Sequence, residues 1–265
     1  MQRIQLILGL GLAAVMAWGS YRLQALSITG AVAAVIVGVL TFGVGGPIPA
    51  VLLILFFVTS SSLSRVGKRD KVQLAAIFDK GGRRDHGQVL ANGLVAAIMA
   101  AIYGLDGSPM WLAAVVGSLA SANADTWATE IGVLSRTWPR LITTGVRVAP
   151  GTSGGVSPVG SMAAAAGAGL IGLAAWWLTG AWAFLAASLA GGIAGATLDS
   201  VLGATVQGIY YCEACRKETE RHPKHTCGGE TIRLRGWDGL RNDGVNLMAT
   251  ALGAMVGAGV AVLAL

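Results

Sequence analysis

The chain has 265 residues, of which 54% are hydrophobic and 12% charged, and its formal net charge is +6. Soluble domains carry about 25% charged residues, so this composition excludes an ordinary soluble protein. No basic soluble domain stands apart from the apolar segments, which excludes a nucleic-acid-binding protein. Runs of roughly 20 apolar residues are typical of transmembrane helices. We therefore predict an all-α, polytopic membrane protein with a single transmembrane domain at 1–265.

Eight apolar segments predict a bundle of 7–8 transmembrane helices joined by loops. The 39 glycines are typical of helices that pack closely in lipid. Arg3 precedes the first segment, but no small-residue cleavage site follows, so this segment is expected to be a helix rather than a signal peptide. The segments are residues 4–20, 25–44, 47–63, 88–105, 109–134, 156–179, 181–210 and 245–265.

Three connections between these segments hold 17 of the 19 Lys and Arg residues. The positive-inside rule predicts that these three connections face the cytoplasm, which for eight helices puts both termini outside. We expect an integral protein of the inner cell membrane with its active site facing the cytoplasm. The predicted cytoplasmic loops are a basic interfacial loop at 64–87, a glycine-rich phosphate loop at 135–155 and a Cys/His loop at 210–243.

Two acidic residues lie inside the fifth apolar segment, in the stretch SANADTWATEIG. A carboxylate in hydrocarbon costs a few kcal/mol or more, so it usually faces the bundle interior and marks a site. Asp125 and Glu130 are five residues apart, about 140° around a helix, and do not share a face. We expect Asp125 to face the site and Glu130 to support it from the side. The alternative is that Asp125 pairs with a neighbouring polar group for packing alone.

The seventh segment carries a stripe of small and polar residues at every fourth position, which places them on one helix face. Polar residues also open the fourth and eighth segments from the cytoplasmic side. We expect polar groups from four helices, Asp125 included, to meet at one depth. The stripe comprises Gly191, Gly195, Asp199, Gly203 and Gln207, and the other polar residues are Gln88, Asn92, Asn242, Asp243 and Asn246.

The sixth segment is preceded by PGTSGGVS, a stretch rich in glycine and hydroxyl groups. Backbone N–H groups at such a helix N-terminus bind anions, and Arg140 and Arg147 lie near enough in sequence to contact phosphate oxygens. The spacing is not that of a Walker A motif, and a plain glycine turn into a helix would look the same. The predicted phosphate-binding residues are Gly151, Thr152, Ser153, Gly154, Gly155 and Ser157.

Carboxylates beside a phosphate-binding loop predict a magnesium site. Mg²⁺ prefers one or two carboxylates together with phosphate oxygens and water. We predict Asp125 and Asp199 as its ligands, with Asp243 as an alternative. Such a site supports phosphoryl or nucleotidyl transfer, in which positioning and charge neutralisation do most of the catalysis.

All three cysteines lie in YCEACRKETERHPKHTCGG. A C-x2-C pair followed by His and Cys can form a tetrahedral zinc site, and a cytoplasmic location disfavours a disulfide. We predict a structural zinc site formed by Cys212, Cys215, Cys227 and His225, with His222 as the alternative fourth ligand. The other interpretation is a reduced polar loop that binds no metal.

The loop SRVGKRDKVQLAAIFDKGGRRDHG predicts a basic interfacial helix that ends at Gly81–Gly82. Attraction to anionic lipid headgroups explains its charge at least as well as substrate binding does. Its last residues, 83–86, lead directly into Gln88 and could bring a basic group to the site.

Five motifs in order, GGRRDHGQVLANG, SANADTWATEIG, PGTSGGVS, LDSVLGATVQ and NDGVN, resemble those of an integral-membrane family. That family includes the phytyl-phosphate kinase of tocopherol biosynthesis and a poorly characterised animal relative. The resemblance runs from about residue 25 to the C-terminus. More distantly, the motifs are similar to those of the CTP-using membrane enzymes, which include dolichol kinase and the lipid cytidylyltransferases.

The resemblance implies a magnesium- and nucleotide-dependent enzyme that acts on a membrane isoprenoid or its phosphate. It implies metal or nucleotide roles for Asp125 and Asp199 and a phosphate loop at 151–157. It also adds Asn123 to Asn92, Asn242 and Asn246 as polar residues of the site. The loop APGTSGG lacks the lysines usual in the cytidylyltransferases, and RND replaces their terminal lysine-aspartate motif.

We therefore expect a kinase that moves the γ-phosphoryl group of CTP or another nucleoside triphosphate to an isoprenyl monophosphate, whose phosphate would lie near Arg140 or Arg147. The alternatives are a CTP-dependent cytidylyltransferase and a carrier of lipid phosphates. Magnesium and a structural zinc ion are the expected cofactors. The expected partners are a lipid phosphate, a nucleotide and the membrane, with a homo-oligomer left open.

Overall fold

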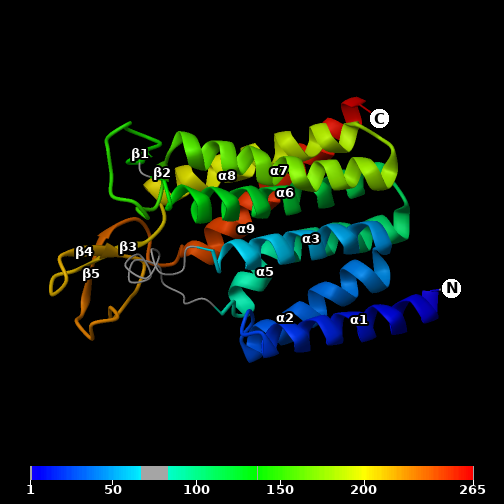
Figure 1. Ribbon diagram of the computed structural model, residues 1–265, viewed down its shortest axis with the longest axis horizontal. Helices are drawn as coiled ribbons and strands as arrows, with labels where there is room; N and C mark the ends of the chain where they lie inside the picture. Colours follow the sequence, from blue (N-terminus) through cyan, green and yellow to red (C-terminus); the bar gives the residue numbers. More distant parts are fainter. Residues whose placement is uncertain (1, 67–82, 136, 265) are drawn as a thin grey trace.

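The computed structural model of the protein describes residues 2–66, 83–135 and 137–264. The interfacial helix predicted within 64–87 therefore lies largely outside the described residues. Eight α-helices within the described residues form a bundle, and short strands gather at one end of it (Figure 1). The predicted helical membrane bundle is confirmed, and five of its helices are long and apolar enough to cross a membrane.

The helices follow the predicted apolar segments closely. The second segment forms a helix that ends in a π-helical stretch, η1 (Val39–Val44). The α-helices are α1 (Gln2–Arg22), α2 (Ile28–Gly38), α3 (Pro47–Leu63), α5 (His86–Asp106), α6 (Pro109–Gly132), α7 (Pro158–Thr179), α8 (Ala183–Thr205) and α9 (Asn242–Ala264).

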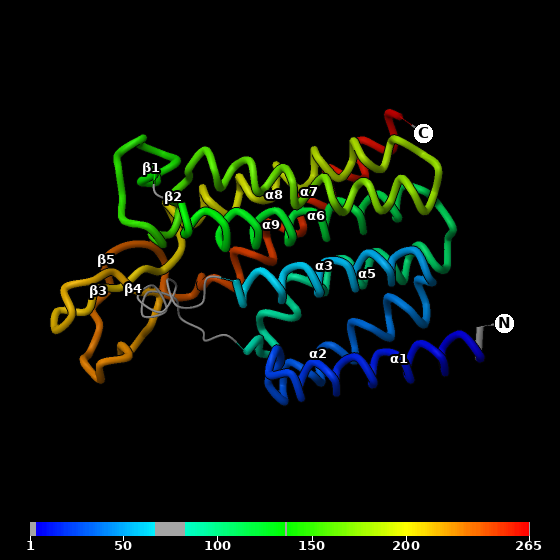
Figure 2. The backbone as a smooth tube through the Cα atoms, in the orientation of Figure 1, coloured from blue at the N-terminus to red at the C-terminus, as the bar shows by residue number. Residues whose placement is uncertain are grey.

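The helices run alternately in opposite directions, as Figure 2 shows. Both termini lie at one end of the bundle, and the strand-bearing connections lie at the other (Figure 1). The glycine-rich loop and the Cys/His loop are therefore neighbours in space although they are far apart in the sequence. This common end is where a site built from both could form.

Helix α6 is the centre of the bundle. Every residue from 112 to 124 is buried, and the helix packs against α3, α5, α7, α8 and α9. Most of these buried side chains are Ala, Ser, Gly or Val, so the neighbouring backbones can approach closely. The polar residues near the end of α6 are thus held among several helices.

Glycines set the distance between α6, α8 and α9. A Cβ atom on Gly195 would lie 2.8 Å from the carbonyl oxygen of Ala249, and one on Gly191 would lie 2.6 Å from that of Gly253. Carbon atoms make contact at about 3.5–4.0 Å, so no side chain fits at either position. The predicted glycine stripe of α8 thus faces its neighbouring helices, and it brings the end of α8 close to that of α6.

The segment 181–210 is not one continuous helix as predicted. The amides of Val206 and Gln207 both donate to the carbonyl of Leu202, which closes the last turn of α8. The chain then enters a strand, and Gln207 is fully buried beyond the helix end rather than on a helical face.

Two small antiparallel sheets form at the loop end, and the helical pattern of the sequence did not predict them. Strands β1 (Arg140–Leu141) and β2 (Gly155–Val156) pair across the glycine-rich connection. Strands β3 (Ile209–Cys212), β4 (Lys217–Thr219) and β5 (Thr231–Arg235) form a sheet in the order β4-β3-β5. We call residues 209–235 the β module.

The close helix packing predicts the effect of one substitution. Gly195→Val should destabilise the protein by about 1–3 kcal/mol or more, because the added carbons meet backbone atoms that cannot move aside. A loss of this size lowers the thermal midpoint by about 2–4 °C per kcal/mol in a chain of this length. The measurement is thermal unfolding in detergent.

The matched control is Gly259→Val, on the exposed side of α9, where an added Cβ meets no atom within 4 Å among the described residues. Equal midpoints for the two variants would contradict the packing argument.

Candidate functional site

A cavity of about 440 Å³ lies at the loop end of the bundle. Its walls come from the end of α6, the start of α7, the second half of α8 and the glycine-rich connection. Asp125, Asp199 and all seven residues from Gly151 to Ser157 line it. The structure therefore brings together the two predicted carboxylates and the predicted phosphate loop.

The two carboxylates have the features that a cation site requires. Oδ2 of Asp199 is buried and has no hydrogen-bond partner in the part of the chain that the structure describes. The carboxylate of Asp125 lies close enough to interact with it electrostatically. Buried polar atoms are normally paired, and two adjacent carboxylates repel each other unless a cation or proton intervenes. Their donor chemistry fits Mg²⁺.

Glu220 is a third acidic residue of the cavity, and the sequence analysis missed it. It follows strand β4 and reaches the cavity from the β module. Its Oε1 accepts a hydrogen bond of 2.9 Å from Nε2 of Gln207, and its charge acts on Asp199. Its sequence signal is only that of an acid in a charged loop, since nothing in the spacing links it to the helices.

The glycine-rich loop is held against the end of α8. Gly154 has a φ of +82°, and a Cβ atom there would lie 2.5 Å from the backbone nitrogen of Ala204. Only glycine meets both conditions. The amides of Thr152 and Gly155 donate to carbonyls within the loop, so these two donors are already used. Anion binding by this loop would therefore depend on its other amides and hydroxyl groups.

Helix α7 begins at the wall of the cavity. Oγ of Ser157 accepts a hydrogen bond of 3.1 Å from the amide of Gly160 and so caps the helix. Gly160 and Ser161, in the first turn, line the cavity. A helix N-terminus carries a partial positive charge, which favours an anion at this wall.

A chain of hydrogen bonds joins the loop, the helix end and the β module. Oγ of Ser153 donates to Oε1 of Gln207 at 2.8 Å, while Nε2 of the same Gln207 side chain donates to Glu220. Because one end of the Gln207 amide accepts and the other donates, its orientation is fixed by both neighbours. Gln207 thereby sets the position of Glu220 relative to the glycine-rich loop.

Arg235 of β5 makes a second connection. Its Nη1 donates to the carbonyls of Gly203 and Ala204 at 2.9 and 2.7 Å, and its Nη2 donates to the carbonyl of Ser153 at 3.3 Å. These carbonyls belong to the last turn of α8 and to the loop. A cation at a helix C-terminus is favourable, so Arg235 stabilises this corner of the cavity.

Several predicted site residues lie elsewhere. Asn123 is buried among helices, where Nδ2 donates to the carbonyl of Gly167 at 2.8 Å and Oδ1 accepts from Thr59. Arg140 and Arg147 are exposed, and Nη1 of Arg140 donates to the carbonyl of Gly145. Neither arginine is among the described residues that line the cavity, because the β1–β2 connection carries both outward.

The polar residues at the starts of α5 and α9 also lie away from the cavity. Gln88 closes a capping box with Asp85, and Gln88 and Asn92 line a separate, largely apolar cavity of about 90 Å³ beside Arg84. The described lining of the carboxylate cavity includes none of the predicted residues of α9, which are Asn242, Asp243 and Asn246. In the first turns of α9, Nδ2 of Asn246 donates to the carbonyl of Asn242.

Glu130 points away from the cavity as well. It accepts a hydrogen bond from Oγ of Ser64, and it interacts with the charge of Arg84. The 140° between Asp125 and Glu130 thus places the two acids on different sides of α6, and Glu130 joins α6 to the neighbouring α3 end rather than to Asp125.

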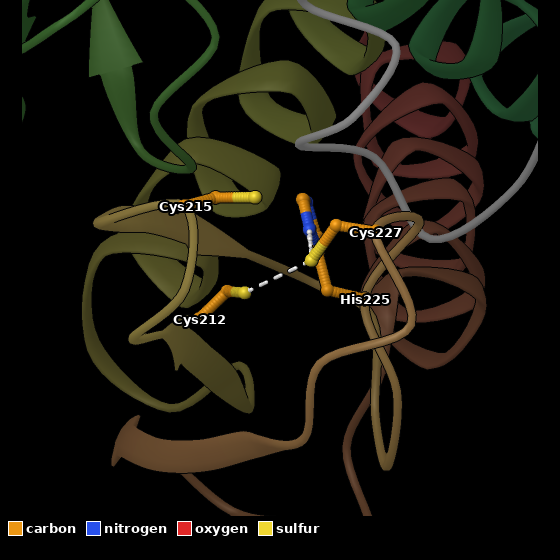
Figure 3. Close-up of side chains that lie close together, drawn as sticks. All are labelled: Cys212, Cys215, His225 and Cys227. Atoms are coloured by element: carbon orange, nitrogen blue, oxygen red, sulfur yellow. Dashed lines mark hydrogen bonds between the residues drawn. The ribbon is translucent and has the colours of Figure 1, made fainter.

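The predicted zinc ligands lie together at the tip of the β module (Figure 3). The ligand atoms of Cys212, Cys215, His225 and Cys227 all lie within 4.8 Å of one another. Hydrogen bonding from His225 lowers the pKa of the Cys227 thiol to about 6. His222 is engaged elsewhere, since its ring stacks on Tyr210 with 4.4 Å between centroids.

The comparisons with known proteins identify the family. The model of the integral membrane protein family DUF92 matches residues 11–254. The chain belongs to the DUF92 family. The family resemblance predicted from the motifs is thereby confirmed.

Relatives of this DUF92 protein occur in plants, archaea and cyanobacteria. Protein PGR of Arabidopsis thaliana is 32% identical over 278 aligned residues, which cover 94% of each chain. An uncharacterized membrane protein of Methanocaldococcus jannaschii is 35% identical over 78% of this chain and 74% of its own. One of Synechocystis sp. is 28% identical over 85% of this chain and 78% of its own. No solved structure matches the chain.

The paired carboxylates predict a metal-dependent change in stability. Without a divalent cation, Asp199→Asn should raise the midpoint of thermal unfolding, because it removes one of two charges that repel each other. Mg²⁺ should raise the midpoint of the unmodified protein through binding to the folded state, and should do so much less in the variant. Differential scanning fluorimetry with and without Mg²⁺ measures both effects.

The control is Asp106→Asn, whose carboxylate accepts a hydrogen bond from Trp111 at the other end of the bundle. An equal Mg²⁺ shift in the Asp199 and Asp106 variants would remove Asp199 from the metal site.

Proposed function

We propose that this protein is a membrane kinase that transfers the γ-phosphoryl group of CTP or another nucleoside triphosphate to an isoprenyl monophosphate. The observation that carries the proposal is the meeting of Asp125, Asp199 and the glycine-rich loop around one cavity. The motif resemblance supplies the substrate class, and the basic loops favour a cytoplasmic location for the cavity. Arg140 and Arg147 are exposed and are not among the described residues of the cavity lining, so the proposal assigns the lipid phosphate to neither.

The proposed reaction needs no strong general base. An oxygen of the lipid monophosphate is already anionic, and it forms a bond to the γ-phosphorus while the bond from that phosphorus to the bridging oxygen breaks. The products are a lipid diphosphate and a nucleoside diphosphate. Consistent with this chemistry, the described residues lining the cavity include no His, Cys, Lys or Arg.

Among the described residues, charge neutralisation would come from other groups. Asp125 and Asp199 would hold Mg²⁺, which when bound supplies positive charge to the phosphate oxygens. The N-terminus of α7 adds a partial positive charge at the wall formed by Gly160 and Ser161. The hydroxyl group of Thr152 is a further donor for phosphate oxygens, whereas that of Ser153 already donates to Gln207.

The lining of the cavity also suits a lipid substrate. Ile193, Ala196 and Ala164 give it an apolar side between α7 and α8. Ile193 is 47% exposed on the outer surface of the bundle, so the cavity wall continues into a face that lipid would cover. An isoprenyl chain could lie along this side with its phosphate at the carboxylates.

The test uses purified protein, Mg²⁺, phytyl or geranylgeranyl monophosphate, and CTP labelled at either the α or the γ phosphorus. Label in the lipid from the γ position alone is the expected result. Label from the α position alone would instead identify a cytidylyltransferase. If neither label is transferred, with ATP and GTP also tried, the kinase proposal fails for these substrates, and lipid-phosphate transport becomes the next function to test.

Two substitutions test the carboxylates directly. Asp125→Asn and Asp199→Asn should each lower kcat by about 100-fold or more, the range seen when one preorganised electrostatic group is lost. Both variants should still fold, as size-exclusion chromatography in detergent would show.

Asp106→Asn is the matched control and should keep full activity, because the 16 helical residues 109–124 of α6, at about 1.5 Å each, separate its region from Asp125. Near-normal turnover in either cavity variant would exclude that residue from the catalytic site.

A further inference from the structure

The tip of the β module has the geometry of a closed metal site. Sγ of Cys212 and Sγ of Cys227 are 3.6 Å apart, and Nδ1 of His225 lies 3.3 Å from Sγ of Cys227. Two sulfurs bound tetrahedrally to one zinc ion at about 2.3 Å would be about 3.8 Å apart. The observed separations are thus close to those that a shared zinc ion requires, and Figure 3 shows the side chains converging on one point.

Other uses of these side chains fit less well. A disulfide needs sulfurs about 2.05 Å apart, and all three cysteines are free. A fifth candidate ligand, His222, directs Nδ1 to the hydroxyl of Thr231 at 3.2 Å. Three thiols and one imidazole, contributed by two turns of the chain, form a Cys₃His set of the kind found in structural zinc sites.

The β module is of the small size that a bound metal ion often stabilises. Its three strands have four, three and five residues, and the exposed large side chains of β5 include Ile232 and Leu234. A segment this small buries too little apolar surface to hold a fold, so small modules usually depend on a metal or disulfides.

Two of the predicted zinc ligands also flank the segment that carries Glu220. Cys215 precedes this segment, His225 follows it, and β4 within it pairs with β3 through Thr219 opposite Tyr210. Glu220 places its charge where it acts on Asp199, and this repulsion favours its movement out of the cavity. Ligands at both ends of the segment would oppose that movement.

We propose that Cys212, Cys215, His225 and Cys227 bind one zinc ion, and that this ion holds Glu220 in the wall of the carboxylate cavity. The place of Glu220 in the cavity then depends on metal ligands that lie on both sides of it in the sequence. The zinc site itself does not rest on the proposed kinase activity.

The first measurement is metal content. Protein purified without a histidine tag and dialysed against metal-free buffer should contain about one zinc ion per chain. Replacing zinc with cobalt should give the visible absorption bands of a tetrahedral thiolate site. His222→Ala, the matched control in the same loop, should keep the ion, whereas Cys215→Ser should lose it. His225→Cys should retain it, because four thiolates also bind zinc.

The second measurement is amide hydrogen exchange of the intact protein before and after removal of the metal by a chelator. Loss of zinc should increase exchange in the segments 216–224 and 151–155, since Gln207 connects the two. Protein without zinc would overturn the metal site. If the protein contains zinc but its amide exchange in 216–224 is unchanged by metal removal, the proposal that zinc holds Glu220 in place would be overturned. Neither readout uses phosphoryl transfer, so failure of the kinase assay would leave both conclusions standing.

Discussion

The close approach of α6, α8 and α9 is the constraint on which the rest of the structure depends. Glycines on the facing sides of these helices let backbones touch where any side chain would collide. In a membrane, helices gain little from hydrophobic burial against one another, so such close packing supplies much of their attraction. The same packing carries Asp125 and Asp199 to one depth, and it holds them near each other despite their repulsion.

The carboxylate cavity is therefore assembled from parts of different character. Helices α6 and α8 are rigid and supply the acids, while the glycine-rich loop and the β module are irregular and cover the end of the bundle. Gln207 and Arg235 join these parts through hydrogen bonds to the loop and to the last turn of α8. Several polar groups at this end of the bundle are thus paired with one another, whereas Oδ2 of Asp199, a residue of the cavity lining, has no hydrogen-bond partner among the residues that the structure describes.

The carboxylate cavity and the Cys/His cluster have side chains suited to two different metal ions. The carboxylates suit a hard cation that works with phosphate oxygens, whereas the thiols and imidazole suit a zinc ion that closes a loop. Glu220 is common to both parts, since it lies between the predicted zinc ligands Cys215 and His225 in the sequence and lines the carboxylate cavity in space.

The sequence by itself determined the helical bundle, the glycine stripe of α8 and the list of polar motifs, because apolar length and fourfold spacing are properties of each segment alone. It also predicted that the Cys and His side chains of the loop lie together, since their spacing in a short loop limits where they can go. Only the tertiary structure decided which polar groups meet. Asn123, Gln88 and Asn246 face other neighbours, and Glu220 enters the cavity, because helix rotation and the path of the β module are set by packing between segments that are distant in sequence.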